Sequence, residues 1–112
     1  MIRTKFKNNP YASVSGTCLQ GYIREDFYNL VKIFGDPTDG DGYKQDAEFI
    51  IEYKDGDKTK VATIYNYKNG RNYNGDSAPK RQNIFEWNVG GHSREAYFTI
   101  QKILIRQKIN KA

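Results

Sequence analysis

Two segments combine residue types that suit the binding of a phosphorylated, aromatic ligand. In the first, 89–94 (VGGHSR), a predicted strand runs through two glycines into the start of a predicted helix. Backbone N–H groups and the helix dipole attract an anion there, and glycines let it approach closely. His92, Ser93 and Arg94 could add hydrogen-bond donors. The alternative is that the glycines only make the turn and that Ser93 only caps the helix.

The second segment, 65–73 (YNYKNGRNY), mixes tyrosines, basic residues and asparagines. Its aromatic and basic members are Tyr65, Tyr67, Tyr73, Lys68 and Arg71. Aromatic faces stack on bases, Arg pairs with phosphate, and Asn reads base edges, so this composition fits a nucleotide. The alternative is an inward pair of tyrosines on a strand followed by a solvated loop, because Tyr is also common in sheets.

Residues for catalysis are few. Nucleophilic catalysis needs a Cys or Ser activated by a base; Cys18 is the one cysteine and His92 the one histidine, which makes these two a candidate pair. We expect Cys18 to be a small buried hydrophobe instead. Zinc sites need three or four Cys and His ligands, which rules out a structural zinc. We therefore expect no catalytic residues, no metal and no cofactor.

The turn at 36–46 has a passing likeness to a calcium loop, through Asp39 and Asp41. A calcium loop of the EF-hand type closes with a bidentate carboxylate at its twelfth position, which here is Ile50. A solvated loop is the better interpretation. The carboxylates of Glu48 and Glu52 lie on the polar face of a predicted strand, where solvation alone would place them.

The composition fits one small basic domain. The chain has 112 residues, a net charge of +5 and an aromatic fraction of 14%, which together predict a single, aromatic-rich core and a preference for anionic partners. The first ten residues lack the apolar run of a secretory signal, and no stretch is long and apolar enough to span a bilayer. We expect a cytoplasmic protein that does not enter membranes.

Periodicity and turn residues predict an α+β fold in the order β-α-β-β-β-α. An antiparallel sheet of about four strands should carry two helices on one face. The predicted strands are 17–23, 47–53, 59–67 and 83–89. One predicted helix carries Phe27 and ends at Phe34 or Gly35, because Pro37 prevents its continuation; the other starts at Ser93. Residues 1–15 are expected to be a flexible arm or edge segment, and 16–112 one domain.

Inward-facing residues follow from the same patterns. The first helix should bury Phe27, Leu30, Val31 and Phe34. The last strand should bury Phe85, Trp87 and Val89. The last helix should bury Ala96, Ile100, Ile103 and Leu104. Residues 68–81 should form a long loop, and long loops often carry function.

The stretches LQGYI, DFYNLVKIFGDP, AEFIIEY with DG, VATIYNYKNGRNY and FEWNVGGHS, within residues 16–105, resemble small bacteriophage-encoded proteins. Within that group the chain resembles the anti-Thoeris sponges, which sequester cyclic ADP-ribose signals of bacterial defence systems without cleaving them. The resemblance implies a homo-oligomer with pockets between protomers, an aromatic stack for adenine and arginines for the diphosphate. The residue types that match these roles are Tyr65, Tyr67, Arg71, Tyr73, Trp87, Asn88, His92, Arg94 and Arg106, with Ser93 in the same turn.

The sequence thus predicts a non-catalytic phage anti-defence protein. It would act in the host cell cytoplasm and bind a signalling nucleotide, either of the cyclic ADP-ribose type or a cyclic oligonucleotide. The alternative is an inhibitor that presents its basic, Tyr-rich surface to a host defence protein such as a CRISPR effector. Direct binding of nucleic acid is less favoured, because no nucleic-acid motif is recognisable.

Overall fold

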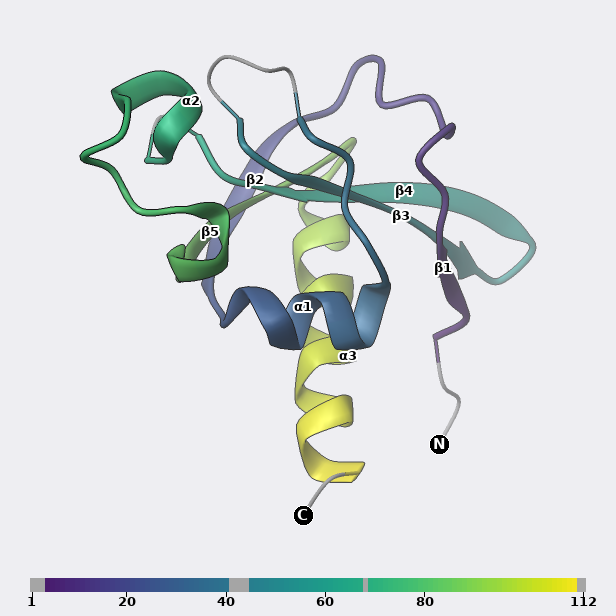
Figure 1. Cartoon of the computed structure of the whole chain (residues 1–112). Coiled ribbons are helices and arrows are strands. Elements are labelled where there is room, and N and C mark those ends of the chain that lie inside the picture. Colours follow the sequence, from purple (N-terminus) through teal and green to yellow (C-terminus); the bar gives the residue numbers. More distant parts are fainter. Residues whose placement is uncertain (1–3, 41–44, 68, 111–112) are drawn as a thin grey trace.

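The computed structural model describes residues 4–40, 45–67 and 69–110, with the side chains only as far as Gln107. The fold is α+β: a five-stranded antiparallel sheet in the spatial order β1-β3-β4-β5-β2, with α1 and α3 on one face (Figure 1). The strands are β1 (Phe6–Asn8), β2 (Cys18–Arg24), β3 (Glu48–Asp55), β4 (Lys58–Tyr65) and β5 (Glu86–Gly91). The helices are α1 (Phe27–Phe34), α2 (Arg71–Asn74), α3 (Arg94–Asn110) and the 3-10 turn η1 (Arg81–Asn83).

The predicted fold class is confirmed, but the number of elements is not. The sheet has five strands where about four were expected, because residues of the segment 1–15 form β1 and pair antiparallel with β3. A three-residue strand with a lysine at its centre carries no readable alternation, so its pairing depends on the neighbouring strand. A short helix, α2, also lies within the predicted loop 68–81.

Helix α1 begins and ends where the sequence predicts. The side chain of Asp26 accepts a hydrogen bond from the backbone N–H of Asn29 at 3.3 Å, which caps the first turn. At the other end Gly35 has a φ of 85° and donates its N–H to the carbonyl of Val31 at 2.8 Å. Three of the four predicted inward residues are buried and Val31 is partly buried, so α1 lays its apolar face on the sheet.

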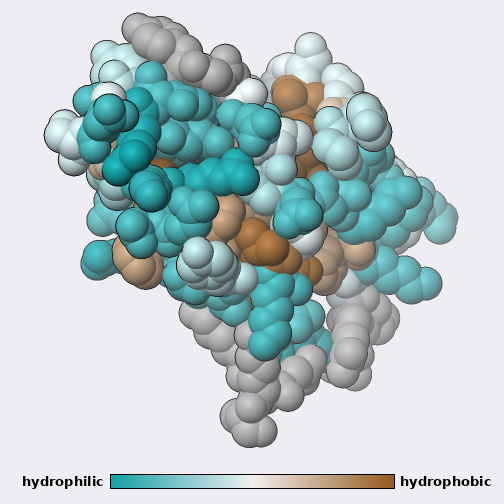
Figure 2. Space-filling model, in the orientation of Figure 1, coloured by the Kyte–Doolittle hydropathy of each residue, from teal (hydrophilic) through white to brown (hydrophobic). Residues whose placement is uncertain are grey.

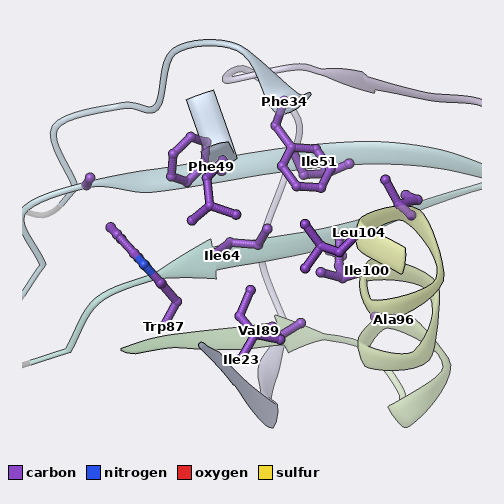
Figure 3. Close-up of a cluster of buried hydrophobic side chains, with 14 of the residues drawn as sticks. Ile23, Phe34, Phe49, Ile51, Ile64, Trp87, Val89, Ala96, Ile100 and Leu104 are labelled. Atoms are coloured by element: carbon purple, nitrogen blue, oxygen red, sulfur yellow. The ribbon is translucent and has the colours of Figure 1, made fainter. Parts of the chain in front are cut away.

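Helix α3 packs very closely on β5. The predicted inward residues Ala96, Ile100, Ile103 and Leu104 are all buried, and Figure 3 shows three of them beside Ile51, Ile64 and Val89 of the sheet. A Cβ atom on Gly91 would lie 2.3 Å from the Cβ of Ala96. The glycine is therefore required for this helix to approach the strand. None of the described helices is long and apolar enough to cross a membrane.

Aromatic rings form the centre of the core. The ring centroid of Trp87 lies 6.1 Å from that of Phe27 and 6.0 Å from that of Phe49, and all three side chains are buried. The indole N–H of Trp87 donates to the carbonyl of Glu25 at 3.1 Å, so its one polar group is satisfied.

In the view of Figure 2 the surface is mostly hydrophilic, and hydrophobic residues gather near the middle, at the level of α1.

The segment between β1 and β2 runs from one edge of the sheet to the other, on the side away from α1 and α3 (Figure 1). It begins at Asn9, whose side-chain amide donates to Glu52 at 2.8 Å. On that second face Ile50, Val61 and Thr63 are buried, with 9% or less of each exposed. We infer that this segment covers them.

Two predicted inward residues are exposed. Cys18, expected to be buried, is exposed near the start of β2. Phe85, predicted to point inward with Trp87 and Val89, is 53% exposed because β5 begins one residue later, at Glu86. In both cases the residue lies at a strand end, where alternation no longer fixes the direction of a side chain.

Strand β2 is an edge strand whose outer side is covered by a side chain. The hydroxyl of Tyr97 on α3 donates to the backbone carbonyl of Tyr22 at 3.0 Å. Its ring lies against Gly21, where a Cβ would come within 2.6 Å of the ring carbons. The strand pairing also shifts register between Leu19 and Gly21, as in a β-bulge. Covered carbonyls and bulges both protect an edge from pairing with another chain.

This protection can be tested with Tyr97→Phe, which keeps the ring and removes the hydroxyl. We expect a loss of about 1–2 kcal/mol in the free energy of unfolding, measured in urea, because the hydroxyl's bond to Tyr22 and the bond it accepts from the amide of Gln101 are both lost. We also expect self-association that increases with protein concentration in sedimentation. Tyr28→Phe makes the same change on an exposed α1 residue and should alter neither quantity; equal behaviour of the two variants would contradict the role given to Tyr97.

Candidate functional site

The residues selected from the sequence do not form one cluster. Trp87 lies in the core with 0% of its surface exposed, so its ring is not available to stack on a ligand. Arg94 begins α3, and its guanidinium lies over the rings of Tyr97 and Phe98 at 5.8 and 5.7 Å. Arg106 is twelve residues further along that helix, which is roughly 18 Å at 1.5 Å per residue.

The turn 89–94 is filled by the protein's own side chains. A Cβ on Gly90 would lie 2.6 Å from the hydroxyl of Thr63 and 3.3 Å from the ring of Tyr65. The side chain of Ala96 fills the place that a Cβ on Gly91 would take. The ring of His92 packs against Gly16. Both glycines therefore lie within β5 and leave room for side chains on its two faces, which neither interpretation of this segment predicted. Ser93 and its neighbours are exposed at the start of α3.

A buried asparagine holds the segment 65–73. The side-chain oxygen of Asn66 accepts the backbone N–H groups of Asp46 at 2.6 Å and Ala47 at 3.1 Å, and its amide donates to the carboxylate of Asp46 at 3.0 Å. That carboxylate also accepts the backbone N–H of Asn72 at 3.3 Å. This network ties the end of β4 and helix α2 to the start of β3.

Beyond Asn66 the two tyrosines and Arg71 are exposed. Tyr67 and Tyr73 are 45% and 40% exposed, and the guanidinium Nε of Arg71 donates to the carbonyl of Ala78 at 3.1 Å. Lys68 lies outside the described residues. Among the predicted tyrosines, only Tyr65 is on a strand.

Tyr65 belongs to a row of side chains that crosses the second face of the sheet. Tyr22 on β2 is opposite Asn88 on β5, Asn88 is opposite Tyr65 on β4, and Tyr65 is opposite Glu48 on β3. We call these four residues the aromatic row. Their neighbours along the strands, Ile23, Trp87 and Ile64, point into the core, so the row faces away from the helices. Two predicted residues, Tyr65 and Asn88, thus come together with one that was missed, Tyr22.

Tyr22 was missed because the pairing of β2 with β5 joins residues far apart in the sequence. The alternation in each strand correctly indicates which residues point inward, and therefore that Tyr22 and Asn88 point outward. Only the register of β2 on β5 places them side by side. Tyr22 is 65% exposed, the most accessible ring of the row.

Tyr65 is held in its protonated form. Burial is the main cause that raises its pKa, and the nearby charge of Glu48 acts in the same direction, while a hydrogen bond from Asn88 partly offsets them. At neutral pH the phenol is therefore a hydrogen-bond donor and not a base. The site can bind and orient a polar group, but Tyr65 offers no proton acceptor for catalysis.

A cation stands beside the row. Arg24 follows Tyr22 by two residues, on the same face of β2, and its guanidinium is 82% exposed. It lies 3.9 Å from the carboxylate of Glu86, a loose and exposed pair that an incoming anion could replace. The row therefore has a cation near its β2 end and a carboxylate, Glu48, at its β3 end.

The described residues supply neither a metal cluster nor a nucleophile and base pair. Among them no three His, Cys, Asp or Glu residues are grouped as ligands, and Asp39 pairs with Arg81 at 3.1 Å. Asp41, the other residue of the calcium-loop likeness, lies outside the described residues. The thiol of Cys18 accepts a hydrogen bond from the amide of Gln20 at 3.3 Å, and no described bond joins it to His92.

Comparisons of the chain with protein-family models, with curated proteins and with solved structures gave no significant match.

The role of the buried asparagine can be tested with Asn66→Ala. We expect a loss of about 3 kcal/mol in the free energy of unfolding, because two backbone N–H groups lose their acceptor in a buried place. Hydrogen exchange at the amide of Asn72 should also become faster. Asn83→Ala, at an exposed position, is the control and should cost less than about 0.5 kcal/mol. An Asn66→Ala protein as stable as the control would contradict this account.

The environment of Tyr65 predicts a pH dependence. Its pKa in the folded state is above the ordinary value near 10, so the unfolded chain loses this proton first and stability should fall as the pH rises beyond about 10. Asn88→Ala should raise the pKa of Tyr65 further, because the hydrogen bond that favours the phenolate is lost. Carbon NMR of labelled tyrosine rings would measure both effects. Tyr53 lies elsewhere in the fold, where burial is the main cause that raises its pKa, and this pKa should be the same in Asn88→Ala.

Proposed function

We propose that the protein binds a nucleotide at the aromatic row and does not convert it. One observation carries the proposal: Tyr22, Asn88 and Tyr65 lie in register on three adjacent strands, on the face of the sheet away from the helices. Aromatic rings on adjacent strands are a good surface for bases, because every base has a face that stacks and an edge that an amide can read.

The spacing of the strands suits a planar ligand. Neighbouring strands lie about 4.8 Å apart, so β2 and β4 are separated by roughly 10 Å across β5. A base standing over Asn88 would have Tyr22 on one side and Tyr65 on the other. Asn88 is opposite Tyr65 in the strand register, and the amide and oxygen of its side chain suit an adenine edge. Arg24, two residues beyond Tyr22, would pair with a phosphate.

The proposal assigns no catalytic step to the row. Tyr65 keeps its proton at neutral pH, Arg24 can only stabilise negative charge, and the carboxylate of Glu48 lies at the β3 end of the row. Binding without turnover is what a sequestering protein needs. With the resemblance to anti-Thoeris sponges, this supports a phage anti-defence role in the host cell cytoplasm, with a cyclic ADP-ribose or cyclic oligonucleotide signal as the ligand.

A homo-oligomer is part of the same proposal. The ring of Tyr22 is 65% exposed, whereas tight ligands are usually buried over most of their area. A second copy laid over the row would enclose the ligand between protomers. The loop residues Tyr67, Arg71 and Tyr73 are exposed and could contribute from either copy.

The proposal can be tested by ligand release and by variants. The protein is incubated with a panel of cyclic nucleotides, freed of unbound material and heated, and the released ligand is identified. Tyr22→Ala should weaken binding of that ligand by about fivefold to 150-fold, since stacking on one base contributes about 1–3 kcal/mol. Tyr22→Phe should retain most of the affinity.

Tyr28→Ala is the matched control. Tyr28 is 63% exposed, close to the 65% of Tyr22, but it lies on α1 and therefore on the other side of the sheet. Calorimetric titration should give it the affinity of the unaltered protein. Recovery of no nucleotide from the panel, or equal losses in Tyr22→Ala and Tyr28→Ala, would overturn the assignment.

A further inference from the structure

The outer edge of β1 presents unpaired backbone groups. Lys5 accepts the N–H of Lys54 at 2.9 Å, and Asn9 donates to the carbonyl of Ile50 at 2.9 Å. Hydrogen-bonded pairs alternate along an antiparallel ladder, so Lys7 is bonded to Glu52 of β3 while Phe6 and Asn8 direct their N–H and C=O groups away from it. In the described part of the sheet no strand lies beyond β1, so these groups face outward.

A shallow hollow lies beside this edge. It is lined by Lys5, Phe6, Lys7, Glu52, Tyr53, Lys54 and Thr59. Its lysines outnumber its one carboxylate, and that carboxylate is already engaged, 3.7 Å from Lys7 and 2.8 Å from the amide of Asn9. Lys54 donates to the hydroxyl of Thr59 at 2.6 Å, and no described carboxylate pairs with Lys5 or Lys54. The hollow therefore carries a net positive charge that favours an anionic partner.

We propose that the edge of β1 binds an extended, acidic segment of a protein partner, which adds to the sheet as a sixth strand. The free N–H and C=O groups of Phe6 and Asn8 recognise the main chain of the segment, and the three lysines recognise its carboxylates. Nucleic acid would satisfy the lysines but would leave the carbonyls of the edge without donors in register. The chemistry therefore favours a polypeptide.

A second copy of this chain is a poor occupant of the same edge. Two β1 strands paired with each other would bring Lys5 and Lys7 of one copy against those of the other, and like charges on paired strands are unfavourable. Lysines on short edge strands commonly prevent such self-pairing. The same charges that repel a copy select an acidic strand.

The pattern of the partner follows from the geometry. Lys5 and Lys7 are two residues apart and share one face of β1. Phe6 lies between them on the other face, and its ring centroid is 5.5 Å from that of Phe34 on α1. A matching strand would alternate carboxylates towards the lysines with apolar side chains towards Phe6. An acetylated and amidated Glu-Val-Glu-Val-Glu peptide is a suitable probe, and Gln-Val-Gln-Val-Gln is its uncharged control.

The experiment is an NMR titration of the full chain with each peptide, at low and at physiological salt. We expect the glutamate peptide to bind at least tenfold more tightly than the glutamine peptide, with a difference that narrows as salt increases. Hydrogen exchange should slow at the amides of Phe6 and Asn8, which gain acceptors. The amide of Lys7, already bonded to β3, should change little.

Variants separate strand addition from general attraction to a basic protein. Lys5→Glu and, independently, Lys54→Glu should weaken the glutamate peptide about tenfold or more. Lys32→Glu makes the same charge change at an exposed position on α1 and should alter affinity less than twofold. Unfolding midpoints confirm that each variant is folded.

Three results would overturn the proposal: equal losses in Lys5→Glu and Lys32→Glu, binding without slower exchange at Phe6 and Asn8, or no binding of the glutamate peptide at millimolar concentration. The outcome is independent of nucleotide binding, because β1 is separated from the nearest tyrosine of the aromatic row by β3.

Discussion

The close packing of α3 on β5 is the constraint on which both faces of the sheet depend. Gly91 must be a glycine because Ala96 occupies the place of its side chain, and Gly90 must be one because Thr63 and Tyr65 occupy the opposite side. Because side chains press on β5 from both faces, a shift of its register by one or by two residues would produce a clash. The position of Asn88 between Tyr22 and Tyr65 is therefore set by packing and not by the row itself.

The start of α3 is fixed to the hairpin of β3 and β4 by charge as well as by packing. The ammonium group of Lys60 lies 2.9 Å from Glu95 of the helix and 2.8 Å from Asp55 of the hairpin. Hydrogen bonds to these two carboxylates raise the pKa of Lys60, so its charge persists at any physiological pH. The side chain of Lys60 is 31% exposed and its carboxylate partners more so, so solvent screens these ion pairs and they orient the helix more than they stabilise the fold.

Periodicity predicted most of the elements, because each buried face repeats in a regular way. Helix α1 with its stop at Gly35, the buried residues of α3 and the hairpin of β3 and β4 follow from local patterns. Strand β1 could not be predicted, since three residues show no alternation. Trp87 shows a different limit: its residue type suits both a core and a ligand site, and only its burial distinguishes them.

The sequence predicted residue types of the candidate site but not which residues lie side by side. Tyr65 was selected with the segment 65–73 and Asn88 through the resemblance, whereas Tyr22 entered only through the pairing of strands that lie far apart in the sequence. Local patterns indicate which way a side chain points. Predicting a site also requires knowing which strands are neighbours. That information resides in the long-range register, which single-sequence patterns do not contain.

The two edges of the sheet are treated differently, and this difference bears on how the chain meets other molecules. At β2 a carbonyl is covered by Tyr97 and the ladder is interrupted by a bulge, so that edge resists pairing. At β1 the backbone groups of Phe6 and Asn8 are uncovered and flanked by lysines. An edge that only needed protection could have been closed in the same way as β2. Leaving it open but charged keeps out a second copy while admitting a strand of opposite charge.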